Sequence, residues 1–362
     1  MGGYLRRRRL WVPLVALAFA TLTASAQVSA TKAAEPAPYV VHNLVSDLPG
    51  AADRVDPNLV NAWGLASLPT SPWWVADNET DVSTIYQADG TPASLVVAIP
   101  GGAPTGLVSN TGSHFVVSEG ASSGTARFLF DTEEGVIAGW SPAVSLTHAV
   151  VAVTRPGADY KGLAIASTAA GDFLYAADFH NARVDVFNDS FGLVTASGAF
   201  VDPELPDGFA PFGITNIGGQ IFVAYAKQDA DQEDEVAGQG LGFVDAFDTG
   251  GNFLGRVATR GQLNAPWGLA RAPANFGTFS GDLLVGNFGD GEINAYEPQP
   301  DGTYERVGAL RGADHKPISI DGLWAIAFGK RTPANGPTDT LFFTAGPDDE
   351  THGLFGTIRV VG

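Results

Sequence analysis

Oxygen-bearing side chains close several apolar segments of the chain, where they could bind a cation. Asp77, Asp178 and Asn287 each end a run of apolar residues typical of a buried strand, and Glu119 has the corresponding place in another segment. Carboxylate and amide oxygens that converge from several strands suit calcium. Asp and Asn also begin turns between strands, so a structural role explains the same positions. The sequence leaves both interpretations open.

Three tryptophans have a polar residue two or three positions before them. An aromatic ring beside an amide or carboxylate can hold a sugar or a peptide in a shallow funnel. Packing between sheets accounts for such tryptophans equally well. The pairs are Asn61 with Trp63, Asn264 with Trp267, and Asp321 with Trp324.

Two basic residues are further candidates for a binding site. Lys161 stands where other copies of the repeat described below have Trp, Thr, Phe or Asp, and it could bind an anion or pair with Asp178. His352 could act as a general base or a ligand. Ordinary polar contacts are the simpler interpretation of both residues. The acidic run Asp229–Glu235 lacks the glycine and spacing of an EF-hand loop, so we interpret it as a solvated loop.

The composition excludes several classes of site. The chain has no cysteine, which rules out thiol nucleophiles, thiolate zinc sites and iron–sulfur clusters. Neither a Gly-x-Ser-x-Gly elbow nor a P-loop is present. The formal net charge of −19 disfavours nucleic acids and anionic membranes, whereas it suits cations.

The elements that must position these residues repeat six times. Each copy has a small residue after a polar or aromatic one, then an apolar strand, a turn and another strand. A period of about 50 residues built from strands predicts an all-β fold, a six-bladed β-propeller. We expect the recurring glycines where inner strands converge on the central axis and leave no room for side chains. These are Gly64, Gly106, Gly162, Gly213, Gly268 and Gly322.

The repeat also predicts how the ring closes. The last copy has three strands, and Tyr39–Val45 is expected to pair outside residues 355–361 as the fourth. In the second copy, His114–Ser118 is expected to be the second strand. We expect a monomer whose propeller spans residues 31–362. The predicted blades lie near residues 58–100, 101–155, 156–205, 206–260, 261–315 and 316–362, with 39–47 added to the last.

Residues 1–30 are typical of a secretory signal peptide. Arg6–Arg9 form a basic run, Trp11–Leu22 is mostly apolar, and Ala24–Ala26 and Val28–Ala30 are two alternative cleavage motifs. The apolar run is shorter than the roughly 20 residues that cross a bilayer. We therefore expect a secreted or periplasmic protein with no membrane contact after cleavage. The four arginines are also compatible with twin-arginine export.

Several segments resemble an uncharacterised bacterial family of exported proteins with six-bladed propellers of the NHL/TolB-like kind. The segments include Asn58–Leu65, Ser71–Asn78, Tyr160–Ala164 and Leu284–Gly291. The resemblance covers nearly all of the chain after the signal, and it implies neither an activity nor catalytic residues. The layout is more distantly similar to propeller lactonases and amidating lyases, which implies a metal in the central channel.

These observations favour a binding module that presents one face of the ring to its ligand. The partner could be a small molecule, a polysaccharide or a protein. The alternative is a lactonase-like, calcium-dependent hydrolase or lyase with its site in the central channel. The sequence leaves open whether the chain is an enzyme.

Overall fold

The computed structural model describes residues 1–2 and 37–361. The predicted signal peptide, apart from residues 1–2, lies outside the described residues. Residues 37–361 consist of strands, loops and two short 3-10 helices, Asn78–Thr80 and Gly277–Phe279. No helix in these described ranges is long and apolar enough to cross a membrane.

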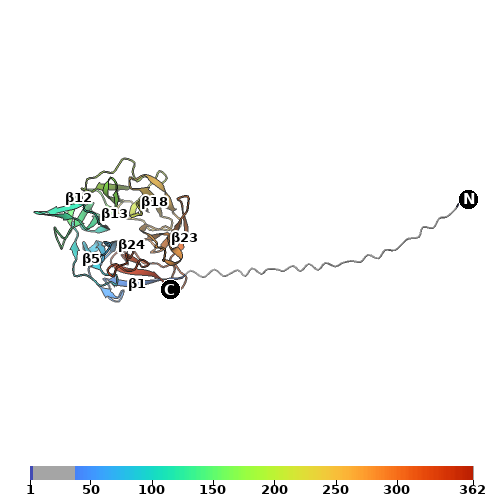
Figure 1. The fold of residues 1–362 in the computed structure, drawn as a ribbon, viewed down its shortest axis with the longest axis horizontal. Coiled ribbons are helices and arrows are strands. Elements are labelled where there is room, and N and C mark those ends of the chain that lie inside the picture. Colours follow the sequence, from blue (N-terminus) through green and yellow to red (C-terminus); the bar gives the residue numbers. More distant parts are fainter. Residues whose placement is uncertain (3–36, 362) are drawn as a thin grey trace. The chain divides into compact units, whose positions relative to one another are not determined.

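Six sheets stand around a common axis in residues 37–361 (Figure 1). Each innermost strand packs against the innermost strand of the next sheet, and the last returns to the first. Hydrogen-bonded neighbours are antiparallel except β1 and β2. The predicted six-bladed β-propeller is therefore confirmed. From the axis outward, the first sheet has β3 (Ala62–Ala66), β4 (Trp73–Asp77), β5 (Val82–Tyr86) and β6 (Val97–Ala98), and the second has β7 (Pro104–Ser109), β10 (Phe128–Thr132), β11 (Val136–Trp140) and β12 (Val150–Thr154). The third has β13 (Tyr160–Thr168), β14 (Gly171–Asp178) and β15 (Arg183–Asn188), and the fourth has β16 (Phe209–Ile217), β17 (Gln220–Lys227), β18 (Gly242–Asp248) and β19 (Phe253–Thr259). The fifth has β20 (Pro266–Arg271), β21 (Leu283–Asn287), β22 (Ile293–Pro298) and β23 (Tyr304–Ala309), and the sixth has β24 (Leu323–Phe328), β25 (Leu341–Ala345), β26 (Leu354–Val360), β1 (Tyr39–Ser46) and β2 (Arg54–Val55).

The first long strand closes the ring, as the sequence predicts. β1 pairs with β26 from Tyr39 opposite Val360 to Ser46 opposite Leu354. The Tyr39 hydroxyl also donates to the Phe276 carbonyl oxygen at 2.9 Å, which ties the closing strand to the fifth sheet. The outer edge of β26 is thereby paired, and it no longer offers unsatisfied backbone groups to another chain.

The second sheet corrects one predicted strand. Residues 116–119 (β8, Val116–Glu119) pair with β9 (Ser122–Thr125) in a separate two-stranded hairpin, so His114–Ser118 is not the second strand. That place belongs to β10, whose residues are all buried. Thr132, rather than Glu119, therefore ends the second strand of this sheet. Both segments contain a short run of consecutive apolar residues, Phe115–Val117 and Phe128–Phe130, and the sequence pattern alone does not separate them.

A β-bulge interrupts every innermost strand at the same place. In all six sheets the register shifts between the first residues of the innermost strand and its partner. A bulge redirects the side chain that it carries. The bulged residues are Trp63, Thr105, Lys161, Phe212, Trp267 and Trp324.

The residue after the bulge packs against the neighbouring sheet. A Cβ atom at Gly213 would overlap the Trp267 carbonyl oxygen, and one at Gly106 would overlap the Leu163 nitrogen. Glycine is therefore required by crowding between adjacent inner strands, not by crowding at the axis. The predicted sixth glycine is wrong, because Ala325 follows the bulge there and Gly322 lies in a turn with a φ of 62°.

The bulge of the second sheet depends on a buried carboxylate. Asp131 Oδ1 accepts hydrogen bonds from the Gly106 nitrogen at 2.6 Å and from Thr105 Oγ1 at 3.0 Å. Its Oδ2 atom is buried without a partner. Burial raises the pKa of Asp131 to about 7, although both hydrogen bonds oppose this.

The substitution Gly213→Ala should destabilise the fold. Its added methyl group forces the fourth and fifth inner strands apart, and overpacking of this kind costs ~1–3 kcal/mol. Urea unfolding measures the loss. Gly250→Ala is the control, because a Cβ there meets no atom closer than 3.3 Å. Equal unfolding free energies for the two variants would contradict the packing described here.

The substitution Asp131→Asn should remove part of the dependence of stability on pH. The folded pKa lies above the unfolded value of 3.8, so folding takes up a proton between the two values. The unfolding free energy of the wild type therefore falls as pH rises to 7, by at most about 1.4 kcal/mol per pH unit from this group. The amide of the variant keeps an oxygen that can accept the hydrogen bonds from Gly106 and Thr105, and it does not ionise.

Urea unfolding between about pH 5 and pH 8 tests this expectation. The variant should become more stable relative to wild type as the pH rises. Asp314→Asn, at an exposed turn, controls for the loss of one negative charge. A constant difference between Asp131→Asn and wild type over this range would refute the assignment.

Candidate functional site

Aromatic rings carried by the bulges meet at the axis. Trp63 and Trp324 stack with ring centroids 3.6 Å apart, and Trp267 meets both edge-on. Phe212 packs edge-on against Trp324 with centroids 5.7 Å apart, and Phe288 stacks on Trp324 at 4.1 Å. These five residues come from four of the six blades or the loop after them. We call them the aromatic plug, because they fill the axis at this level.

The plug changes the interpretation of the three tryptophans. Trp63 and Trp324 are 2% and 0% exposed, so neither ring is available to a sugar or a peptide. Only Trp267 is half-buried and lines a pocket. Asn61 is buried and accepts a hydrogen bond from Trp324 Nε1 at 2.8 Å, so it positions the plug.

The remaining predicted ligand residues make structural contacts outside the plug. Asn264 accepts from the Gly238 nitrogen at 2.6 Å and donates to Asp290 at 3.2 Å. The exposed Asp321 accepts from a loop nitrogen at 2.9 Å. His352 Nδ1 lies 2.7 Å from an oxygen of Asp47, and this contact joins the last blade to the closing segment.

Lys161 belongs to a second feature, the acidic pocket. This cavity of about 400 Å³ is lined by Glu133, Glu134, Asp159, Lys161, His180, Glu233, Asp234 and two small residues. The predicted pairing of Lys161 with Asp178 is wrong. Lys161 donates to Glu133 and lies 3.4 Å from Asp159, whereas Asp178 pairs with Arg183 at 2.9 Å.

The charges of the acidic pocket hold Lys161 in its protonated form. Burial acts to lower the pKa of Lys161, but the carboxylates of Glu133 and Asp159 outweigh it and raise the pKa. Burial also raises the pKa of Asp159 to about 7, against the effect of Lys161. Asp234, in the loop predicted to be solvated, lies 3.7 Å from the same ammonium. Lys161 is therefore a permanent cation that compensates its acidic neighbours.

The three predicted calcium ligands end the second strands of three different blades. Asp77 Oδ2 accepts from the Thr84 nitrogen at 2.8 Å, and burial raises its pKa well above the ordinary value. Asp178 is engaged with Arg183, and Asn287 donates to Asp290 at 3.0 Å. Within residues 37–361, no group of three or more His, Asp and Glu side chains could hold a metal ion. Each of the three ends a strand and stabilises its own turn.

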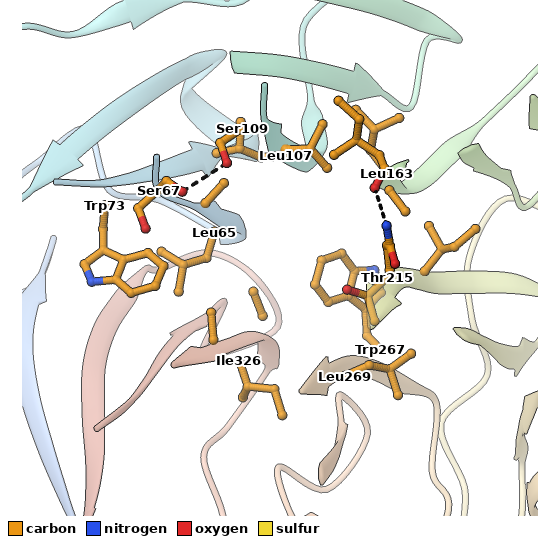
Figure 2. A pocket seen from close by; sticks show the side chains of 18 of the residues that line it. Leu65, Ser67, Trp73, Leu107, Ser109, Leu163, Thr215, Trp267, Leu269 and Ile326 are labelled. Carbon is orange, nitrogen blue, oxygen red and sulfur yellow. Dashed lines mark hydrogen bonds between the residues drawn. The ribbon is translucent and has the colours of Figure 1, made fainter. Parts of the chain in front are cut away.

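A second pocket, the axial pocket, is lined mainly by residues that come after the bulges, in all six inner strands or in the segments after them. Its volume is about 280 Å³. Residues at and just before the bulge of β13 line the acidic pocket, whereas Leu163–Ile165 of the same strand line the axial pocket, so the two pockets lie toward opposite ends of β13. Each of the six blades contributes to the wall of this pocket a Leu or Ile that lies two residues after its bulged residue, and Figure 2 shows five of these side chains, Leu65, Leu107, Leu163, Leu269 and Ile326. This aliphatic ring consists of Leu65, Leu107, Leu163, Ile214, Leu269 and Ile326.

Polar groups form the next layer of the axial pocket. Side chains alternate along a strand, so Ser67 and Ser109 lie on the same face as Leu65 and Leu107. Ser109 Oγ donates to the Ser67 carbonyl oxygen at 3.0 Å (Figure 2). The ammonium of Lys330, in the loop after β24, donates a hydrogen bond to the same oxygen. The pocket therefore joins an apolar wall to a small polar rim.

The sequence contains a local pattern that marks the aliphatic ring, although the candidate site residues predicted from the sequence do not include it. Leu or Ile directly follows the recurring glycine in the first five copies, and Ile326 follows Ala325 in the sixth. The residues directly before the glycine or Ala325 in four copies, Trp63, Phe212, Trp267 and Trp324, belong to the plug. The residues directly after these positions line the hollow part of the axis.

Comparison with solved structures supports the fold. A streptogramin B lyase is 10% identical with a TM-score of 0.51, over 89% of this chain and 98% of that chain. The PQQ-bound aldose sugar dehydrogenase of Streptomyces coelicolor is 15% identical with a TM-score of 0.50, over 90% of this chain and 99% of that chain. At these identities the likeness shows the fold alone.

Comparison of sequences identifies relatives. No protein-family model matches the chain. An uncharacterized protein of Acanthamoeba polyphaga mimivirus is 32% identical over 334 residues, 88% of this chain and 80% of that protein. A second from the same virus is 32% identical over 336 residues, 89% of this chain and 86% of that protein. These relatives are viral, so they do not support a bacterial family. The chain belongs to the same family of uncharacterized proteins as these two mimivirus proteins.

Proposed function

We propose that the chain is a binding module that takes a small, largely apolar ligand in the axial pocket. The observation that carries this proposal is the aliphatic ring, one side chain from each blade, around a cavity of about 280 Å³. Ligand pockets are concave, mostly apolar and supplied with a few polar groups. This size favours a small molecule over the polysaccharide and protein partners considered from the sequence.

The contrast between two levels of the axis supports the proposal. At the bulges the chain fills the axis with stacked rings. Two residues further along, the same strands leave it hollow, although protein interiors are normally close-packed. Stability alone favours filling the axis throughout, since larger apolar side chains at the ring would bury more surface. The hollow therefore fits a role in binding.

The position of the aliphatic ring favours tight binding with a small loss of conformational entropy. Each aliphatic side chain comes from an innermost strand that is paired on one edge and packed against both neighbouring blades. A wall of this kind is already ordered before the ligand arrives. Less conformational entropy is then lost on binding.

The alternative, a calcium-dependent hydrolase or lyase with its site in the central channel, needs oxygen ligands that converge, and the acidic pocket is where several carboxylates lie close together. There the Lys161 ammonium donates to Glu133 and lies between the carboxylates that a cation would need. A metal ion would have to displace a buried ammonium that these carboxylates stabilise. The geometry of this pocket therefore favours a structural ion pair over a calcium site.

The neutral fluorescent probe N-phenyl-1-naphthylamine tests binding in the axial pocket. Wild-type protein should enhance its fluorescence with saturation, because the probe leaves water for an apolar cavity. The substitution Leu65→Trp fills the pocket and should weaken binding at least about tenfold, a loss of ~1.4 kcal/mol. Leu65 is half-buried, so the larger ring has room to enter the cavity.

Leu254→Trp is the matched control for this experiment. Leu254 is 50% exposed on β19, away from the axis, and its replacement should leave probe binding unchanged. Both variants should keep the melting temperature of the wild type within a few degrees. Equal probe affinity in Leu65→Trp and wild type would place the binding elsewhere and refute the proposal.

We also propose that the chain is exported. The basis is the basic run Arg6–Arg9 and the apolar segment Trp11–Leu22. Expressed in full in a bacterium with an outer membrane, the protein should reach the periplasm and lose its first 26 or 30 residues, after Ala26 or Ala30. Cell fractionation and intact mass spectrometry check this. Full-length protein that stays in the cytoplasm would argue against export.

A further inference from the structure

We infer that the ligand of the axial pocket is an amphiphilic carboxylate, with an apolar body on the aliphatic ring and an anionic head on Lys330. This inference rests on the proposed binding function and adds a substrate class to it. The argument concerns the one end of the axial pocket at which Lys330 and Ser67 meet.

Lys330 is a cation that lines the axial pocket without an acidic partner. Its ammonium donates to the Ser67 carbonyl oxygen, and within residues 37–361 no Asp or Glu forms an ion pair with it. The chain has 39 acidic residues against 20 basic ones, so acidic partners are abundant. Lys161, by contrast, has three carboxylates within 4 Å of its ammonium. The charge of Lys330 is therefore left for a group from outside the chain.

The loop that carries Lys330 is fixed in place. The Lys330 backbone nitrogen donates to Asn335 Oδ1 at 3.1 Å. Asn335 is 0% exposed, and its amide donates to the carbonyl oxygens of Pro69 at 3.1 Å and Ser71 at 3.2 Å. These bonds attach the loop after β24 to the first blade. The ammonium is thus held at the rim of the pocket before a ligand arrives.

The surroundings of Lys330 suit an anion. Lys330 is exposed as a whole, and the protein around its ammonium desolvates that group in part, which lowers the pKa of Lys330. A bound carboxylate would compensate that loss through a charge-assisted hydrogen bond. Ser67 adds an independent indication, because it is 0% exposed and its Oγ has no hydrogen-bond partner. Its hydroxyl can donate to the same head group.

The arrangement of polar and apolar groups in the axial pocket fixes the direction in which the apolar body of the ligand lies. Ser67 directly follows β3, two residues after Leu65, and both line the axial pocket, so a head group at Ser67 places the adjoining chain against the aliphatic ring. Beyond the ring, Trp267 of the aromatic plug closes the pocket. The acidic pocket lies toward the other end, where its carboxylates would repel an anion. The charge pattern therefore fits a carboxylate that enters from the Lys330 end.

Calorimetric titration with octanoate and with octan-1-ol tests the inference. The two probes share an apolar chain and differ in the charge of the head. Wild-type protein should bind octanoate at least about tenfold more tightly than octan-1-ol, as a charge-assisted hydrogen bond predicts. Lys330→Met should abolish this preference, so that octanoate binds no more tightly than octan-1-ol. Lys330→Arg should retain part of it.

Lys316→Met is the matched control, because Lys316 is an exposed lysine in a turn outside the pocket. It should keep the full preference for octanoate. Equal binding of both probes by wild type, or an undiminished preference in Lys330→Met, would overturn the inference while the proposed binding function stands. If neither probe binds the wild-type protein, the proposed function and the inference fail together.

Discussion

The β-bulge that recurs in every innermost strand is the constraint on which the rest of the structure depends. It redirects one side chain per blade, so that the rings of Trp63, Phe212, Trp267 and Trp324 meet and fill the axis. It also brings adjacent inner strands so close that glycine follows the bulge in five blades. Beyond the bulges the strands resume regular alternation. Their smaller aliphatic side chains surround a cavity there, and this cavity is where the geometry permits binding.

The two lysines near the axis, Lys161 and Lys330, have different electrostatic environments, and the plug separates them. Lys161 is buried among carboxylates, and its charge is compensated within the chain. Lys330 lines the axial pocket, and among the residues that the structure describes its ammonium donates to a carbonyl oxygen and pairs with no carboxylate. A buried ion pair of the first kind is consistent with a structural role. An uncompensated cation beside an apolar wall indicates a ligand of opposite charge. The environment of each lysine, rather than its residue type, decides which role it has.

The sequence predicts the architecture better than the site. A period of about 50 residues and a spare strand, Tyr39–Val45, are properties of the chain itself, so the blade number and the closure follow from them. Side-chain pairing is not such a property. Lys161 meets Glu133 because of how a loop of the second blade lies against the third, and no local pattern encodes that contact. The exposure of Trp63 likewise depends on partners far away in the sequence. The aliphatic ring was encoded locally, in the residue after each glycine.

The central claim is that the axis is filled at the bulges and hollow beyond them. A crystal structure of the protein under xenon pressure tests it most directly, because xenon enters apolar cavities that water avoids. The account predicts xenon density inside the aliphatic ring of the axial pocket and none within the aromatic plug. Side chains packed across the ring, or an open channel running through the plug, would contradict it.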